Sequence, residues 1–152
     1  METTLKLNTE YKAWLIEVKT RIRQSQIKAA IRVNTEMLDL YWFLGAQIVE
    51  KQEKAKWGDG LIHQLSRDLK AEFPQVEGFS FRNLSYCRQW YCFYYQQNII
   101  VQQVVAQLPD DPDKCIFALI SQIPWGHNIH IITKCKSVPE ALFYVQKTIQ
   151  EG

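Results

Sequence analysis

Apolar residues recur every three or four positions along the first third of this chain, from Tyr11 to Val49. That interval is the period of an α-helix, whereas a half-buried strand would alternate at every second residue. The pattern predicts one or two long helices, with Asn8 as the N-cap of the first. The polar run RQSQ around Ser25 is where we expect a bend or a break. The glycines of KWGDG then offer the left-handed backbone conformations that a helix exit requires.

Two shorter helices joined by a turn follow the long segment. Asp59 or Gly60 opens the first, LIHQLSRDLKAEF, and Pro74 ends it. Its apolar stripe consists of Leu61, Ile62, Leu65 and Leu69. Ser80 is a good N-cap for the second helix, FRNLSYCRQWYCFYYQ. Two helices around a short turn containing Gly78 outline a helix-turn-helix.

The segment LPDDPDK is predicted to be a surface loop because it is rich in proline and aspartate. It would connect a helix or extended piece at 98–108 with an apolar run at 115–123. No alternation typical of a strand appears over a useful length anywhere in the chain. The predicted fold is therefore all-α, a multi-helix domain with long N-terminal helices and a helix-turn-helix-like pair.

The stretch ISQIPWGHNIHII gathers proline, tryptophan, glycine and histidine side by side, as an active site or a helix entrance would. Pro124 stands where a helix from Trp125 to Cys135 would begin, since the first turn tolerates a missing N–H. Ser137 is predicted to cap the last helix, with Pro139 in its first turn. We interpret the stretch as a helix entrance with Trp125 in the core.

No catalytic or metal-binding residues are predicted. His127 and His130 could share a helix face, but zinc requires three or four converging ligands and the spacing provides no such set. Neither G-x-S-x-G, H-E-x-x-H nor a phosphate-binding loop occurs. Asp110 follows a proline as in PD-(D/E)xK nucleases, but the DLK triplet that begins at Asp68 precedes it, which is the wrong order. The chain is expected to be non-catalytic by itself and to need no cofactor. An enzyme would require a pocket around His127, Trp125 and Asp68.

The second helix of the pair is the best candidate for a functional surface. Arg82, Asn83, Arg88 and Gln89 carry the donor-rich side chains that contact guanine, adenine or phosphate. Arg82 and Asn83 fall in its first turn, and the N-terminal residues of a recognition helix enter the DNA groove. These four residues are the predicted DNA-binding site. The alternative is a protein-interaction or dimerisation module, for which Tyr91, Phe93, Tyr94 and Tyr95 would form a large exposed apolar patch.

Length and charge agree with a single domain over residues 1–152. Eighteen Lys and Arg against sixteen Asp and Glu give a net charge of +2, which neither requires nor excludes nucleic acid. Basic residues cluster between Lys12 and Arg32, where Glu17 is the only acidic side chain. With no signal-like N-terminus, no long apolar run and no C-x-x-C pair among four cysteines, the expected location is the cytoplasm and no membrane partner is expected.

Three stretches match a known family in order and spacing. They are VNTEMLDLYWFLGAQIVE with WGDGLIHQLSRDLKAEFPQVEGFSFRNLSYCRQWY, then ISQIPWGHN, then ALFYVQKTIQEG. Over about residues 10–152 the chain resembles the N-terminal domain of YhcG-like bacterial proteins, in which this domain precedes a PD-(D/E)xK nuclease domain. The resemblance implies a helical DNA-targeting module whose partners are DNA and a C-terminal nuclease domain outside this chain. Because the recognition helix has only two arginines, we also expect either a homo-oligomer or help from Lys12–Arg32 in DNA binding.

Overall fold

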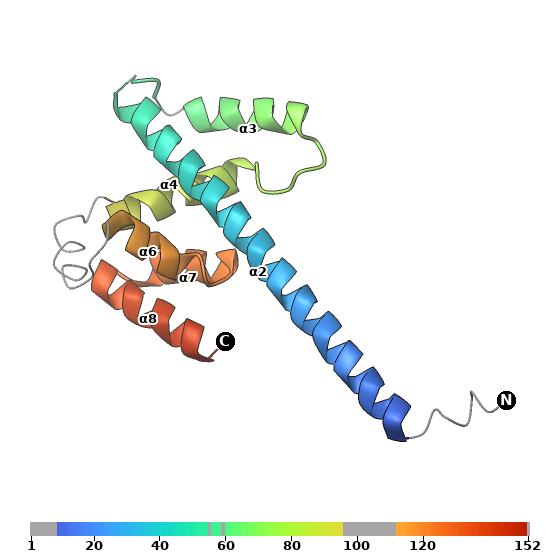
Figure 1. Cartoon of the computed structure of the whole chain (residues 1–152). Coiled ribbons are helices and arrows are strands. Elements are labelled where there is room, and N and C mark those ends of the chain that lie inside the picture. Colours follow the sequence, from blue (N-terminus) through green and yellow to red (C-terminus); the bar gives the residue numbers. More distant parts are fainter. Residues whose placement is uncertain (1–8, 55, 59, 96–111, 152) are drawn as a thin grey trace. The chain divides into compact units, whose positions relative to one another are not determined.

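The computed structural model describes residues 9–54, 56–58, 60–95 and 112–151 (Figure 1). Within these ranges every regular element is an α-helix, which confirms the predicted all-α fold. The elements are α2 (Thr9–Glu53), α3 (Gly60–Glu72), α4 (Phe81–Tyr95), α6 (Pro112–Ile120), α7 (Trp125–Lys134) and α8 (Val138–Glu151). None of these helices combines the length and the apolarity needed to cross a membrane.

The chain divides into two compact units, Met1–Asn34 and Thr35–Gly152, and α2 contributes to both. α2 is one uninterrupted helix of 45 residues, so the predicted bend or break near Ser25 is wrong. The polar run there consists of Arg, Gln and Ser, which have good or moderate helix propensity and only interrupt the apolar pattern. The proposed N-cap Asn8 lies outside the described residues.

The core of the second unit has two parts. The larger is built on the fully buried Trp90 of α4, which meets the rings of Trp42 and Trp125 edge-on at centroid distances of 5.1 and 4.9 Å. The smaller joins α3 to α2 and α4 and buries Ile48, Ile62, Phe79 and Leu84. The predicted stripe of α3 packs there, since Leu61, Leu65 and Leu69 lie against it.

Polar contacts hold the connection between α3 and α4 in place. Ser80 accepts a hydrogen bond from the Asn83 backbone N–H at 3.1 Å, which confirms Ser80 as the N-cap. Buried Ser66 donates to the carbonyl of Phe79 at 2.7 Å. Gly78 has φ +104°, and a Cβ there would collide with the Tyr41 hydroxyl, so glycine is required. The connection runs over residues 73–80, longer than the three or four residues typical of a helix-turn-helix.

Proline marks the entrances to the C-terminal helices. α6 begins at Pro112, so the last three residues of LPDDPDK form its first turn and the prediction of a loop over all of that segment is wrong. Proline is favourable at this position because its missing N–H would be unpaired anyway. α7 begins after Pro124, and Ser137 Oγ accepts from Glu140 N–H at 3.4 Å at the entrance to α8, both as predicted. α4 contacts α3 and α7, and α8 contacts α6 and α7.

Candidate functional site

All four predicted DNA-binding residues lie on α4, but their surroundings differ. Arg82 and Gln89 are exposed, whereas Asn83 and Arg88 are half-buried. The guanidinium carbon of Arg82 lies 5.8 Å from the centre of the Tyr86 ring, so the arginine is held near the helix surface by a cation–π contact. α4 thus brings the four residues onto one helix, with two of them facing solvent.

Arg88 is anchored to the long helix. Its Nε donates to Gln52 Oε1 on α2 at 2.5 Å, so Gln52 fixes the orientation of the guanidinium. A hollow of about 490 Å³ adjoins this pair. The hollow is lined by Gln52, Ile62, Phe81, Ser85, Arg88 and Gln89. Amide, hydroxyl and guanidinium groups therefore share one concave surface along α4.

Asn83 serves the fold itself. Its Nδ2 donates to the Gly78 carbonyl at 2.7 Å, and its Oδ1 accepts from the indole N–H of Trp125 at 2.8 Å. Burial, and then the nearby Cys87, raise the pKa of Tyr41, and a hydrogen bond with the same Asn83 side chain opposes this rise. Both ends of the amide are therefore engaged within the protein. A direct contact between Asn83 and DNA would require these bonds to be exchanged.

The PWGH stretch is a helix entrance that is tied to the core. Trp125 packs against Tyr41 and Trp90, with both ring centroids 4.9 Å away. Asn128, one turn later, is fully buried, and its Nδ2 donates to the carbonyls of Ile120 at 2.9 Å and Ile123 at 3.3 Å. Sequence reasoning missed Asn128, whose only signal was an amide on the apolar face of the helix. These contacts fix the turn between α6 and α7.

Replacing Trp125 with alanine should destabilise the protein by about 2–3 kcal/mol. The change removes two ring contacts and leaves Asn83 Oδ1 without its donor, while the partial exposure of the indole limits the loss. Thermal unfolding followed by circular dichroism measures the effect. Trp57→Ala is the matched control, because Trp57 is 60% exposed and should change stability by less than about 0.5 kcal/mol. Unchanged stability of Trp125→Ala would contradict its structural role.

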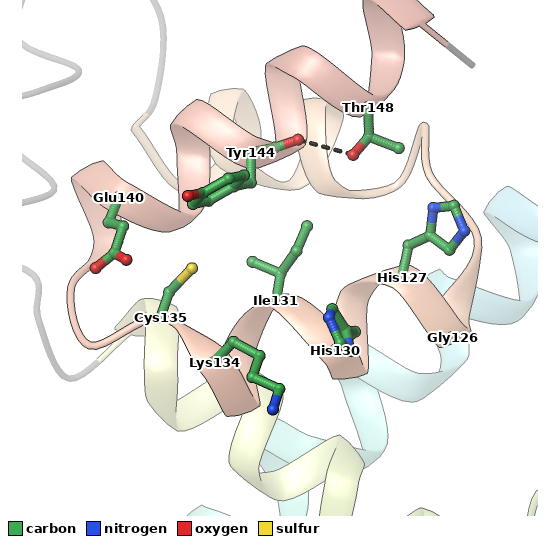
Figure 2. Close-up of a pocket in the computed structure, with 9 residues that line it drawn as sticks. All are labelled: Gly126, His127, His130, Ile131, Lys134, Cys135, Glu140, Tyr144 and Thr148. Carbon is green, nitrogen blue, oxygen red and sulfur yellow. Dashed lines mark hydrogen bonds between the residues drawn. The ribbon is translucent and has the colours of Figure 1, made fainter.

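A groove of about 790 Å³ lies between α7 and α8 (Figure 2). Ile131 and Cys135 point between the two helices, whereas the Lys134 side chain extends away from α8. The Thr148 hydroxyl donates to the Tyr144 carbonyl at 2.8 Å, so it is engaged by its own helix. The lining consists of Gly126, His127, His130, Ile131, Lys134, Cys135, Glu140, Tyr144 and Thr148.

The thiol in this groove is not activated as a nucleophile. Burial, and then the nearby charge of Glu140, raise the pKa of the Cys135 thiol, which keeps it protonated and weakly nucleophilic. Among the described residues no three His, Cys, Asp or Glu side chains are grouped to hold a metal. The described lining of this groove includes His127 but neither Trp125 nor Asp68.

The aromatic run at the end of α4 is mostly used for packing. Tyr94 is buried at 2% exposure, and Tyr91 and Phe93 are half-buried, while Tyr95 is exposed. Phe93 packs against the larger core cluster. This run therefore does not form the large exposed apolar patch that the alternative of a protein-interaction module required of it. Seven of the sixteen exposed large apolar residues in the described part of the chain lie in the first unit, where the sequence also has a cluster of basic residues.

Comparison with known proteins identifies the family. A family model described as the DUF1016 N-terminal domain matches residues 17–152. No similar curated protein and no similar solved structure was found. The match covers most of the chain, including all of α3, α4, α6 and α7 and the buried part of α2. The chain therefore belongs to the family of DUF1016 N-terminal domains.

Proposed function

We propose that this chain is a DNA-binding module and that α4 carries the contact surface. The observation that supports this most is the charge of α4, which contains two arginines and no acidic residue over Phe81–Tyr95. Phosphate contacts provide most of the affinity of DNA-binding proteins. A helix without carboxylates can approach the DNA phosphates without electrostatic repulsion from its own side chains.

The arrangement of donors on α4 is also suitable for DNA. Arg82, Ser85 and Gln89 occupy positions i, i+3 and i+7, so they lie along one side of the helix. Arg82 and Gln89 can reach phosphate or base edges, and Arg88 adds the terminal nitrogens of a guanidinium that Gln52 orients. Asn83 supports this surface indirectly, because its hydrogen bond with Trp125 holds the first turn of α4 in place.

We further propose that the module works beside a nuclease domain, as in the YhcG-like proteins that the sequence resembles. In that arrangement the nuclease provides the metal-binding carboxylates and this module brings it to DNA. The donors on α4 suit the DNA-targeting part of such a division.

The double variant Arg82→Ala, Arg88→Ala should bind duplex DNA at least about tenfold more weakly than the wild type, because both phosphate-binding guanidinium groups are lost. The slope of log affinity against log salt should fall by up to about 1.8, at about 0.9 for each phosphate contact removed. Titration of a labelled duplex at several salt concentrations measures both quantities.

The matched control is Lys134→Ala, Lys147→Ala, which removes the same formal charge from exposed positions of α7 and α8. It should keep both the affinity and most of the salt slope. Circular dichroism must show that both double variants remain folded. Equal binding by wild type and the arginine variant, or no binding by the wild type at low salt, would rule out α4 as a DNA-contacting helix.

A further inference from the structure

The first unit exposes an unusual number of large apolar side chains for a solvated helix. Between Thr9 and Asn34, Trp14 is 56% exposed and Ile22 52% exposed. The complete set of exposed large apolar residues in this segment is Tyr11, Trp14, Ile16, Ile22, Ile27, Ile31 and Val33. These residues lie on several sides of the helix, so a single partner helix would cover only part of them.

The segment also has the spacing of a coiled-coil seam, on which Tyr11 and Ile22 are exposed while Leu15 and Val18 are half-buried. Tyr11, Leu15, Val18 and Ile22 are separated by four, three and four residues, which is the alternation of heptad positions d and a. The seam continues with the small residues Ser25 and Ala29. A strict a and d stripe is narrow, and it packs against a partner helix by inserting side chains between those of the partner.

The edges of the seam carry one sign of charge. In the same register Lys12 and Lys19 occupy e positions, and Arg21 and Lys28 occupy g positions. The other two edge positions in this stretch, Trp14 and Gln26, are uncharged, so no acidic residue flanks the seam. Residues at e and g select the partner of a coiled coil, because they face those of the opposite helix. A second copy of this segment would therefore place cations against cations.

We propose that residues 11–29 of α2 form one strand of a heteromeric coiled coil whose partner is an amphipathic helix with acidic e and g positions. The apolar seam excludes water and the four cations select the partner. This interface is separate from the α4 surface and does not depend on DNA binding.

Two other occupants fit the segment less well. Duplex DNA would pair with the cations but would leave Leu15, Val18 and Ile22 without an apolar partner. A helix lying on an anionic membrane needs a polar face opposite its apolar one. Here Ile16 and Ile27 are 65% and 59% exposed and lie outside the seam, so that polar face is interrupted. Apolar spacing and charge together favour an acidic protein helix.

The probe is a labelled synthetic peptide of about four heptads with Leu at a and d and Glu at e and g, titrated with the 152-residue chain. The Glu peptide should bind, and a peptide with Lys at e and g should bind at least about tenfold more weakly. Ile22→Asp should weaken binding of the Glu peptide at least tenfold, because it places a charge in the seam. Ile27→Asp is the matched control, with the same change at a similarly exposed position off the seam, and should bind as the wild type does.

Reversing two edge charges provides the sharper test. Lys19→Glu, Arg21→Glu should lose affinity for the Glu peptide and gain it for the Lys peptide, whereas the Arg82→Ala, Arg88→Ala variant should keep the wild-type preference. The proposal is overturned if the chain binds neither peptide, binds both equally, or responds identically to Ile22→Asp and Ile27→Asp. It is also overturned if duplex DNA or anionic vesicles bind through Ile22 while the Glu peptide does not, or if the wild type dimerises through the seam in sedimentation experiments.

Discussion

Gly45→Ala should destabilise the protein by about 3 kcal/mol or more, the upper end of the usual cost of overpacking. Gly45 is buried in α2, where the helix passes directly over α4. A Cβ at this position would collide with the carbonyl oxygen of Cys87 and lie 2.9 Å from both the Cys87 carbonyl carbon and Tyr91 Cβ. Since these are mainly backbone atoms, relief requires the two helices to move apart and opens the core around Trp90. A large fall in melting temperature is the expected readout.

The control for this prediction is another helical glycine. A Cβ on Gly126 in α7 would meet no atom within 4 Å, so Gly126→Ala should be neutral or stabilise the protein by up to about 1 kcal/mol. Comparing the two variants separates the close approach of helices from the general helix preference of alanine. Similar melting temperatures for Gly45→Ala and the wild type would show that α2 and α4 are not packed as closely as described.

The helices could be predicted from the sequence because local signals are strong at their ends. Ser80, Pro124 and Ser137 each act within one turn of the chain, and each starts a helix where it was expected. Ser25 was misread because a polar run breaks the apolar pattern without breaking backbone hydrogen bonds, and only proline or repeated glycine would have done that. Pro112 was misread because proline is common both in loops and at the first position of a helix.

The candidate site was predictable only in part, because burial decides what a polar side chain does. Arg82 and Asn83 are adjacent and chemically suited to DNA, yet one faces solvent and the other bonds to Gly78 and Trp125. Trp125 follows Asn83 by 42 positions, so no local pattern could have revealed the pairing. Burial also decides the role of the aromatic run ending at Tyr95, since the tertiary fold covers most of it.

The first unit shows another limit of sequence patterns. Its lysines and arginines indicate a possible DNA contact, and the spacing of its apolar residues indicates a helix. Periodicity predicts that a face is apolar but does not tell what covers it. The exposure of Ile22 and Trp14 in the structure is the observation that turns this segment into a candidate interface.

Asn128→Asp should destabilise the protein by about 3–5 kcal/mol at neutral pH, the cost typical of an uncompensated buried charge. The wild-type Nδ2 donates to the carbonyls of Ile120, Ile123 and Pro124, the last at 3.4 Å, and the residue is fully buried. A carboxylate would instead present oxygen to three carbonyl oxygens. The Oδ1 of Asn128 has no partner in the described part of the chain, so no existing donor would stabilise the new charge.

The loss caused by Asn128→Asp should also depend on pH. Burial and the facing carbonyls raise the folded-state pKa of the new carboxyl above its unfolded value of about 3.9, because both disfavour the charged form. Below the unfolded pKa the group is protonated in both states, can donate one hydrogen bond, and the penalty is smallest. As pH rises through the folded pKa the penalty grows to its full size.

Gln122→Glu is the control for Asn128→Asp. Gln122 Nε2 donates to the Ala118 carbonyl at 2.9 Å, but the residue is exposed, so the same chemical change there should cost less than about 1 kcal/mol. Denaturant unfolding of both variants measures the difference. The pH should run from about 4 to 8, which includes the ordinary carboxyl and histidine pKa values of about 4 and 6.5. Equal, pH-independent losses would show that Asn128 does not hold the turn between α6 and α7.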